Sequence, residues 1–185
     1  MEDIEVRYIG GKIEFKNLSL NLKIFHNFSI VSSFALISDA DEITAQEEFV
    51  RLNAVVNEIN TNDPVSEINL IFPSDIDSVS NGTPKIGVFI FPNNLDKGRI
   101  EDLFLSCVND KPGMQCVNPF IECVFNLEIT PRIPSKAKAL AYLATQEETR
   151  RGVGGAAQIG IWEFNSEELN EATPRAKARG FGPLA

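Results

Sequence analysis

The chain has 185 residues, of which 43% are hydrophobic, and this size and composition fit one globular domain with its own core. Its net charge of -9 argues against the broad basic surface with which most nucleic-acid-binding proteins neutralise phosphate. No apolar run approaches the roughly 20 residues that span a bilayer, and the acidic start Met1–Glu5 lacks the pattern of a signal peptide. We therefore expect a cytoplasmic protein with no membrane partner.

The cysteines and the histidine offer little for catalysis. Cys107, Cys116 and Cys123 are odd in number and show no C-x-x-C spacing, so we expect reduced thiols. A zinc site would need more ligands than these, and His26 is the single histidine. Zinc-dependent and histidine-dependent chemistry are therefore disfavoured.

The first half of the chain is expected to alternate strands and helices. A strand over Ile4–Ile9, a helix over Ile13–Phe25 and a strand over Ile30–Ile37 are predicted from the apolar spacing. The second half of the last strand is apolar throughout, which predicts burial on both faces of a sheet covered by helices. The next helix begins after Thr44, which can form a capping box with Glu47, and ends near Asn60.

Two more strands and a helix are expected in the middle of the chain. Ile68–Phe72 and Ile86–Phe91 have the apolar and β-branched composition of strands, and the Asn81-Gly82 turn lies between them. Pro92 ends the second strand. After Gly98, an apolar stripe predicts a helix that carries Cys107 on its buried side.

The last third is expected to be mainly helical. Val117–Leu127 fits a helix or a strand, and Ser135–Glu148 is predicted to be a helix. Gly152–Gly155 is predicted to be a loop, because its G-x-G-x-x-A pattern follows a polar helix and not a strand, so dinucleotide binding is disfavoured. A short strand is predicted over Ile159–Phe164, and residues 171–185 are expected to form a loose tail.

Four carboxylates lie at predicted strand ends, the positions at which α/β proteins usually have their active sites. Asp39 and Asp41 follow one predicted strand, and Glu101 and Asp102 open the helix after another. If the strands are parallel neighbours, all four side chains lie at the same rim of the sheet. Clustered carboxylates repel one another, and a hard cation such as Mg²⁺ relieves that repulsion. The pattern is therefore compatible with a magnesium site, although Asp-x-Asp alone is a weak signal.

A structural interpretation of the same residues remains open. Acidic residues are common just before a helix and in its first turn, where they interact favourably with the helix dipole. Lys136 and Lys138 lie in the first turn of a predicted helix, where a cation is mildly unfavourable. Their position is a hint of function, although solvated lysines are an equally simple explanation.

Several segments, taken in order, resemble a prokaryotic family of unknown function related to the TOPRIM domain, the catalytic domain of topoisomerases, primases and OLD-type nucleases. The matching segments extend over nearly all of the chain to about Leu169; they are Gly10–Lys12, Ser38–Glu42, Gly87–Asn94, Gly98–Leu103, Lys136–Ala144 and Gly160–Trp162.

The resemblance implies a fold and a site. It implies an α/β, Rossmann-like TOPRIM-type sheet, mostly parallel, with helices on both faces, over residues 1–170. Asp39 and Asp41 match the metal-binding Asp-x-Asp of TOPRIM domains. By the same resemblance, Glu101 and Asp102 serve the metal, and Lys136 is a catalytic residue that faces phosphate.

One departure from the TOPRIM pattern stands out. TOPRIM domains carry a catalytic glutamate in a Glu-Gly setting after their first strand, but Glu2 and Glu5 lack the following glycine. The first βα unit is therefore expected to be missing, so that either the start is truncated or the chemistry has been lost. An open sheet edge would also invite a homodimer.

Two classes of function follow. The first is a Mg²⁺-dependent enzyme acting on a phosphodiester or a nucleotide. The second is a catalytically inactive TOPRIM-like module that binds a partner, with nucleic acid or a nucleotide as a weakly supported choice for an acidic protein.

Overall fold

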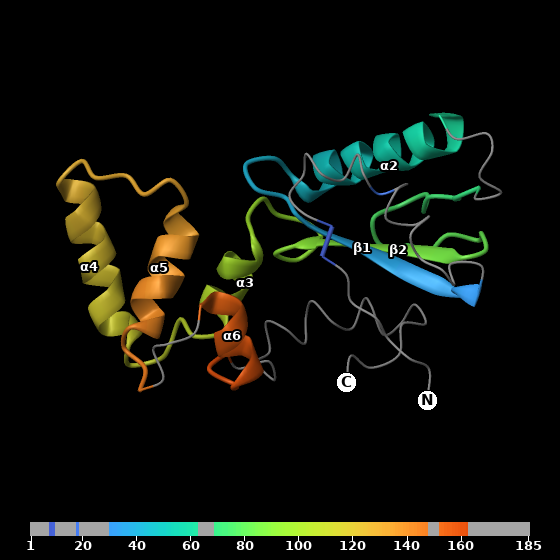
Figure 1. Ribbon diagram of the computed structural model, residues 1–185. Coiled ribbons are helices and arrows are strands. Elements are labelled where there is room, and N and C mark those ends of the chain that lie inside the picture. The colour runs from blue at the N-terminus through green and yellow to red at the C-terminus, as the bar shows by residue number, and fades with distance from the viewer. Residues whose placement is uncertain (1–7, 10–17, 19–29, 63–68, 148–151, 163–185) are drawn as a thin grey trace. The chain divides into compact units, whose positions relative to one another are not determined.

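The computed structural model describes residues 8–9, 18, 30–62, 69–147 and 152–162 (Figure 1). The chain divides into two compact units. Unit 1 comprises Met1–Ser38 and Gln46–Phe89, and unit 2 comprises Asp39–Ala45 and Ile90–Ala185. Each unit is described by itself below.

Two strands and one long helix form the framework of the described part of unit 1. Strand β1 covers Ser33–Asp39, helix α2 covers Ala45–Asn62 and strand β2 covers Lys85–Phe91. The two strands pair with each other and run in parallel (Figure 1), as the hydrogen bond from the Lys85 N–H to the Ser32 carbonyl at their beginning illustrates. The described part of the chain therefore confirms the α/β class at the level of a two-stranded parallel sheet with helices.

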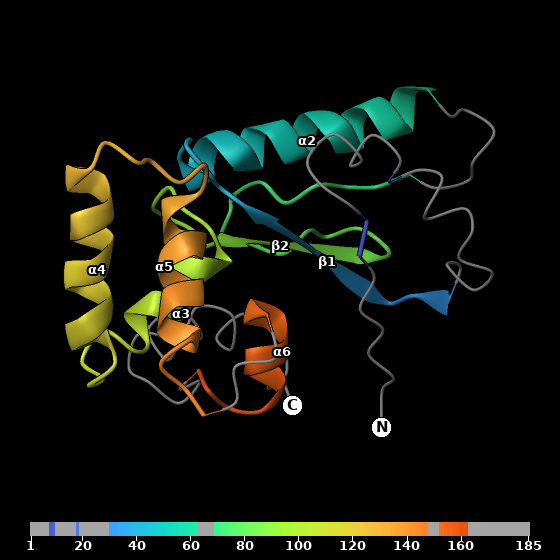
Figure 2. The same ribbon diagram turned by 60° about the vertical axis from the view of Figure 1, so that its left-hand side comes forward.

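Helix α2 follows the sequence prediction closely. It begins at the residue after Thr44, as the capping pattern predicted, and runs alongside the strand pair in both views (Figures 1 and 2). One stripe with helical spacing is buried; its members are Ala45, Phe49, Leu52, Val56 and Ile59. The Phe49 ring also contacts that of Phe72, with centroids 4.9 Å apart. Packing of this stripe fixes the helix in unit 1.

Two predictions about strands in unit 1 are wrong. Burial along β1 alternates, with Leu36 buried and Ile37 55% exposed, because successive side chains of a strand point to opposite faces. Residues 69–72 do not form a strand, and Ile68 lies outside the described residues. The side-chain amide of Asn60 instead hydrogen-bonds both the N–H and the carbonyl of Leu70, at 2.9 and 2.8 Å, so these groups do not enter a ladder.

Unit 1 also encloses a charged group. The Glu48 side chain is fully buried on α2, and it accepts hydrogen bonds from the Ser38 hydroxyl at 2.6 Å and from the Arg51 guanidinium at 2.6 and 2.7 Å. Arg51 lies three residues further along the helix and is 31% exposed. Both carboxylate oxygens of Glu48 thereby receive charge-assisted bonds, as a buried charge requires.

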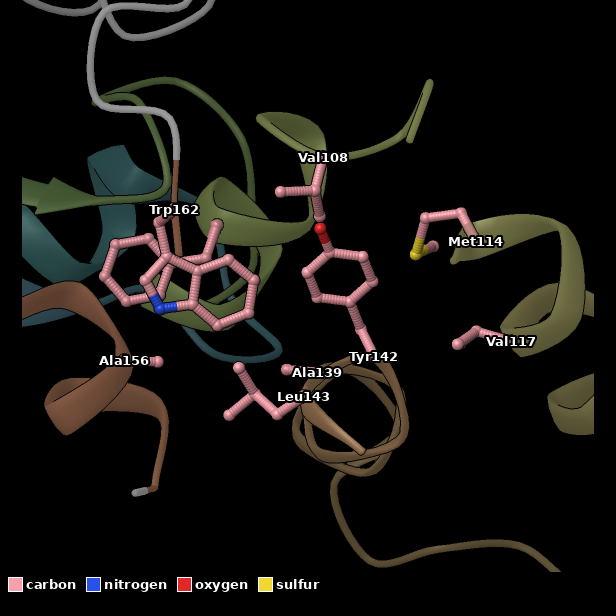
Figure 3. Packing of buried hydrophobic residues seen from close by; sticks show 9 residues of the cluster. Val108, Met114, Val117, Ala139, Tyr142, Leu143, Ala156 and Trp162 are labelled. Atoms are coloured by element: carbon pink, nitrogen blue, oxygen red, sulfur yellow. The ribbon is translucent and has the colours of Figure 1, made fainter. Parts of the chain in front are cut away.

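The described residues of unit 2 form four helices around an aromatic core. They are α3 (Ile100–Ser106), α4 (Met114–Asn126), α5 (Pro134–Leu143) and α6 (Val153–Gln158), and α5 contacts the other three. Trp162 is 1% exposed and stacks against Tyr142 (Figure 3), with ring centroids 5.6 Å apart, and against Phe104, with ring centroids 5.1 Å apart. Its indole N–H donates to the Val153 carbonyl at 3.0 Å, which satisfies its one polar group.

The structure decides several predictions for the last third. Val117–Leu127, left open between helix and strand, belongs to α4. The loop predicted over Gly152–Gly155 is wrong, because Gly152 precedes α6 and the next residues are helical. Residues 159–162 are not a strand, and 163–164 lie outside the described residues. Here Ile161 donates its N–H to the carbonyl of Ala156, so the backbone folds back on α6 instead of extending.

Some predictions concern residues beyond the described ranges. They are most of the strand over Ile4–Ile9, the helix over Ile13–Phe25 apart from the buried Leu18, His26, and the tail at 171–185. Among the described helices, none combines the length and the hydrophobicity that crossing a bilayer requires.

Candidate functional site

The residues that follow β1 are fixed to the segment between β2 and α3. The Ala40 N–H donates to the Phe91 carbonyl at 3.1 Å, and the Asp41 N–H donates to the Gly98 carbonyl at 2.7 Å. At the end of β1, the Asp39 carboxylate accepts a hydrogen bond of 2.9 Å from the Ile100 N–H, the first amide of α3. All of these residues belong to unit 2, and the contacts bring the ends of the two strands together as predicted.

Asp41 has a left-handed backbone conformation just after β1. Its φ angle is +59°, in the left-handed region that aspartate tolerates better than most residues. Its carboxylate binds the Arg99 guanidinium at 2.6 Å, and Arg99 also reaches Glu42 at 3.4 Å. Asp41 is therefore near Asp39, but it is directed towards an arginine that the sequence analysis did not single out.

The two acidic residues of α3 have different surroundings. Asp102 accepts a hydrogen bond of 2.7 Å from the Arg99 N–H and so caps the first turn of the helix. Glu101 is only 9% exposed. Gly98 supports this arrangement, because its φ of +140° suits glycine alone and a side chain there would meet the Asp102 carboxylate. The helix-start interpretation is thus correct for Asp102.

The electrostatics of the site are dominated by excess negative charge. Partial burial raises the pKa of Asp39 above its ordinary value, and the charges of Asp41 and Glu101 raise it further. The hydrogen bond from Ile100 and the charge of Arg99 act in the opposite direction, but they do not cancel the increase. Asp41 and Glu101 are therefore both close enough to Asp39 for their negative charges to act on it, and Arg99 acts on it with the opposite sign.

The lysines of α5 lie at different places. Lys138 lines a hollow of about 540 Å³ beside α3, together with Asp102, Leu105, Ser106, Asn109 and Asp110. Lys136, which the sequence analysis selected, is exposed and does not line this hollow. Residues two apart on a helix point in roughly opposite directions, so only one of the two lysines can face the hollow. Periodicity alone did not indicate which one.

The family model of a protein of unknown function, DUF3226, matches residues 1–173. The chain belongs to this family. No curated protein and no solved structure gives a match to it. Membership of DUF3226 confirms the expectation of a domain of unknown function, whereas the relationship to TOPRIM domains stays a prediction.

The donor atoms of this DUF3226 chain suit magnesium chemically but do not converge in the structure. Carboxylate oxygens are the ligands that Mg²⁺ prefers. Among the described residues, however, no three acidic, histidine or cysteine side chains are grouped so that they could hold a metal ion. The Arg99 guanidinium forms an ion pair with Asp41. Backbone N–H groups donate hydrogen bonds to the carboxylates of Asp39 and Asp102. A cation bound by Asp41 would therefore have to replace Arg99 as its partner.

Proposed function

We propose that this protein is a TOPRIM-like, Mg²⁺-dependent enzyme of phosphodiester or nucleotide chemistry, with its site at Asp39, Asp41, Glu101 and Asp102. The observation that carries the proposal is the position of Asp39 at the end of β1, where the Ile100 N–H binds its partly buried carboxylate and the charges of Asp41 and Glu101 act on it. A divalent cation beside Asp39 would relieve the repulsion from these two carboxylates.

Each residue has a distinct role in the proposal. Asp39 and Glu101 hold the cation, and Asp41 joins them when Arg99 turns to a substrate phosphate, which guanidinium groups bind well. Asp102 keeps its capping role at α3. When bound, Mg²⁺ would lower the pKa of a coordinated water and stabilise a phosphoryl oxygen.

The hollow beside α3 supports the placement of a phosphate-bearing substrate. It adjoins Asp102 and offers the Lys138 ammonium and the Asn109 amide as hydrogen-bond donors. We therefore assign the phosphate-facing role to Lys138 and not to Lys136.

Calorimetric titration with MgCl₂ and MnCl₂ tests the metal site directly. We expect the wild-type protein to bind one cation, and Asp39→Asn and Glu101→Gln each to weaken binding by at least about tenfold because each removes a charged ligand. Glu122→Gln on α4 is the matched control, since Glu122 is exposed and belongs to the same unit. Undetectable binding by the folded wild-type protein would refute the metal site.

A catalytically inactive binding module is the second candidate, and one specific observation favours it. The carboxylates of Asp39, Asp41 and Asp102 already have partners within the protein, so the site is stable without a cation. A protein that binds no Mg²⁺ but binds a nucleotide, with affinity lost in Lys138→Met, would fit this candidate and exclude the enzyme.

A further inference from the structure

Helix α4 has more apolar surface than its own unit covers. It packs on α5 (Figure 2) through Met114, Val117 and the partly buried Ile121. A second apolar row remains exposed on another side of the same helix; we call it the α4 seam, and it consists of Cys116, Phe120, Cys123 and Leu127. At about 100° per residue, the centre of the α4 seam lies roughly 120° around the helix from the buried row.

The spacing within the α4 seam is that of a helix-pairing surface. Its members follow one another at intervals of four, three and four residues, the a/d spacing of paired helices. Phe120 is 56% exposed and Leu127, at the C-terminal end of the helix, is 66% exposed, and the thiols of Cys116 and Cys123 beside them are exposed as well. These four side chains leave on the order of 300 Å² of apolar surface in contact with water, and a patch of this size on a monomer is often functional.

We propose that the α4 seam is the interface at which two copies of this chain associate, with their α4 helices antiparallel about a two-fold axis. The four-three-four spacing is symmetric about a point between Ile121 and Glu122, so a two-fold rotation places the row on itself. Phe120 then lies against the partner's Cys123, and Cys116 lies against the partner's Leu127.

Charge also favours a second copy of this chain as the molecule that binds the α4 seam. With a net charge of -9, two copies repel each other over most approaches. The stretch from Pro112 to Leu127 carries one charge, at Glu122, and the α4 seam itself carries none. A neutral apolar row on an acidic protein is therefore the surface where self-association meets the least repulsion. The exposed apolar area of the α4 seam is less than half of the ~800 Å² that each partner gives to a standard interface, and the residues around the seam supply the rest.

The mass of the protein in solution under reducing conditions, followed by light scattering from low to high micromolar concentration, tests the proposal. We expect a dimer for the wild type and a monomer for Phe120→Glu, with the dissociation constant raised at least about a hundredfold, because two carboxylates would be buried close together. Leu127→Glu repeats the test at a second position of the α4 seam. Leu95→Glu is the matched control, since Leu95 is equally exposed at 57% in a loop of the same unit and should leave the dimer intact.

Thiol alkylation of the wild-type protein identifies the surface without any substitution. Cys116 and Cys123 are exposed in one copy and should become protected from iodoacetamide as the concentration rises, whereas the buried Cys107 should be unreactive throughout. A wild-type protein that stays monomeric at high concentration overturns the proposal. A dimer in which Cys116 and Cys123 stay reactive also overturns it, because another surface, such as the open sheet edge, would then form the contact.

Discussion

Each unit of this protein holds a partly or fully buried carboxylate beside an arginine, but the two arrangements balance charge differently. In unit 1, Glu48 is fully buried, and Arg51 and Ser38 bind both of its oxygens. In unit 2, Arg99 binds Asp41. The negative charges of Asp41 and Glu101 nevertheless contribute to the raised pKa of the partly buried Asp39. In the first arrangement, both oxygens of the buried carboxylate have hydrogen-bond partners within the protein. The second carries surplus charge, and this difference is what singles it out as a candidate site.

The largest effect is expected from breaking the pair in unit 1. Arg51→Met would leave Glu48 buried without its guanidinium partner and should lower the free energy of unfolding by about 3–5 kcal/mol. Urea denaturation followed by circular dichroism measures the loss. Arg132→Met, at an exposed arginine, is the control and should change little. A loss below about 1 kcal/mol would mean that Glu48 becomes solvated or protonated in the variant with little change in the free energy of unfolding.

A smaller loss is expected from the corresponding change in unit 2. Arg99→Met removes the partner of Asp41, whose side chain is 32% exposed, and should lower the free energy of unfolding by about 2 kcal/mol. If the cluster binds a cation, millimolar Mg²⁺ should restore part of that stability, because a ligand that binds only the folded state stabilises it. Equal unfolding curves with and without Mg²⁺ for this variant would count against cation binding.

The smallest effect, and one of opposite sign, is expected from Asp39→Asn. Because the folded-state pKa of Asp39 is raised, the folded protein holds its proton more tightly than the unfolded chain does. The stability of the wild type therefore falls as pH rises from the ordinary carboxyl pKa of about 3.9 through the raised value. Asparagine does not titrate and can still accept the Ile100 N–H.

The variant should thus be slightly more stable than the wild type at pH 7, and the gain should vanish below about pH 4. Denaturation at several pH values measures it, with Asp75→Asn, at an exposed aspartate, as the control. A variant that is less stable at neutral pH would show that the Arg99 charge outweighs burial and repulsion at Asp39.

Local signals in the sequence were sufficient wherever local interactions decide the structure. Thr44 correctly marked the start of α2, and the run from Ile86 to Phe91 correctly marked β2, because capping and β-branched composition act within a few residues. The α/β class and the proximity of Asp39 to α3 followed from the same reasoning. These elements need no knowledge of distant partners.

The remaining features depend on contacts that the sequence pattern does not carry. Asn60 holds Leu70 by two hydrogen bonds, and this side-chain contact replaced the strand predicted over Ile68–Phe72. Asp41 adopts a positive φ and pairs with Arg99, 58 positions further along the chain. The Gly98-Arg99 dipeptide ahead of two acidic residues was the one signal that could have indicated this pair. Lys138, and not Lys136, faces the hollow. Which of the two does so depends on the orientation of α5 about its own axis relative to α3, and the sequence pattern does not carry this information.

The single tryptophan gives the protein a natural spectroscopic reporter. Trp162 lies in the aromatic stack of unit 2, and its indole is shielded from water, so its fluorescence emission should shift to longer wavelength when that unit opens (Figure 3). Unit 1 has no tryptophan, because its share of the sequence contains none. Emission therefore follows unit 2, whereas far-ultraviolet circular dichroism follows the helices of both, and comparing the two signals shows whether the units unfold together or in sequence.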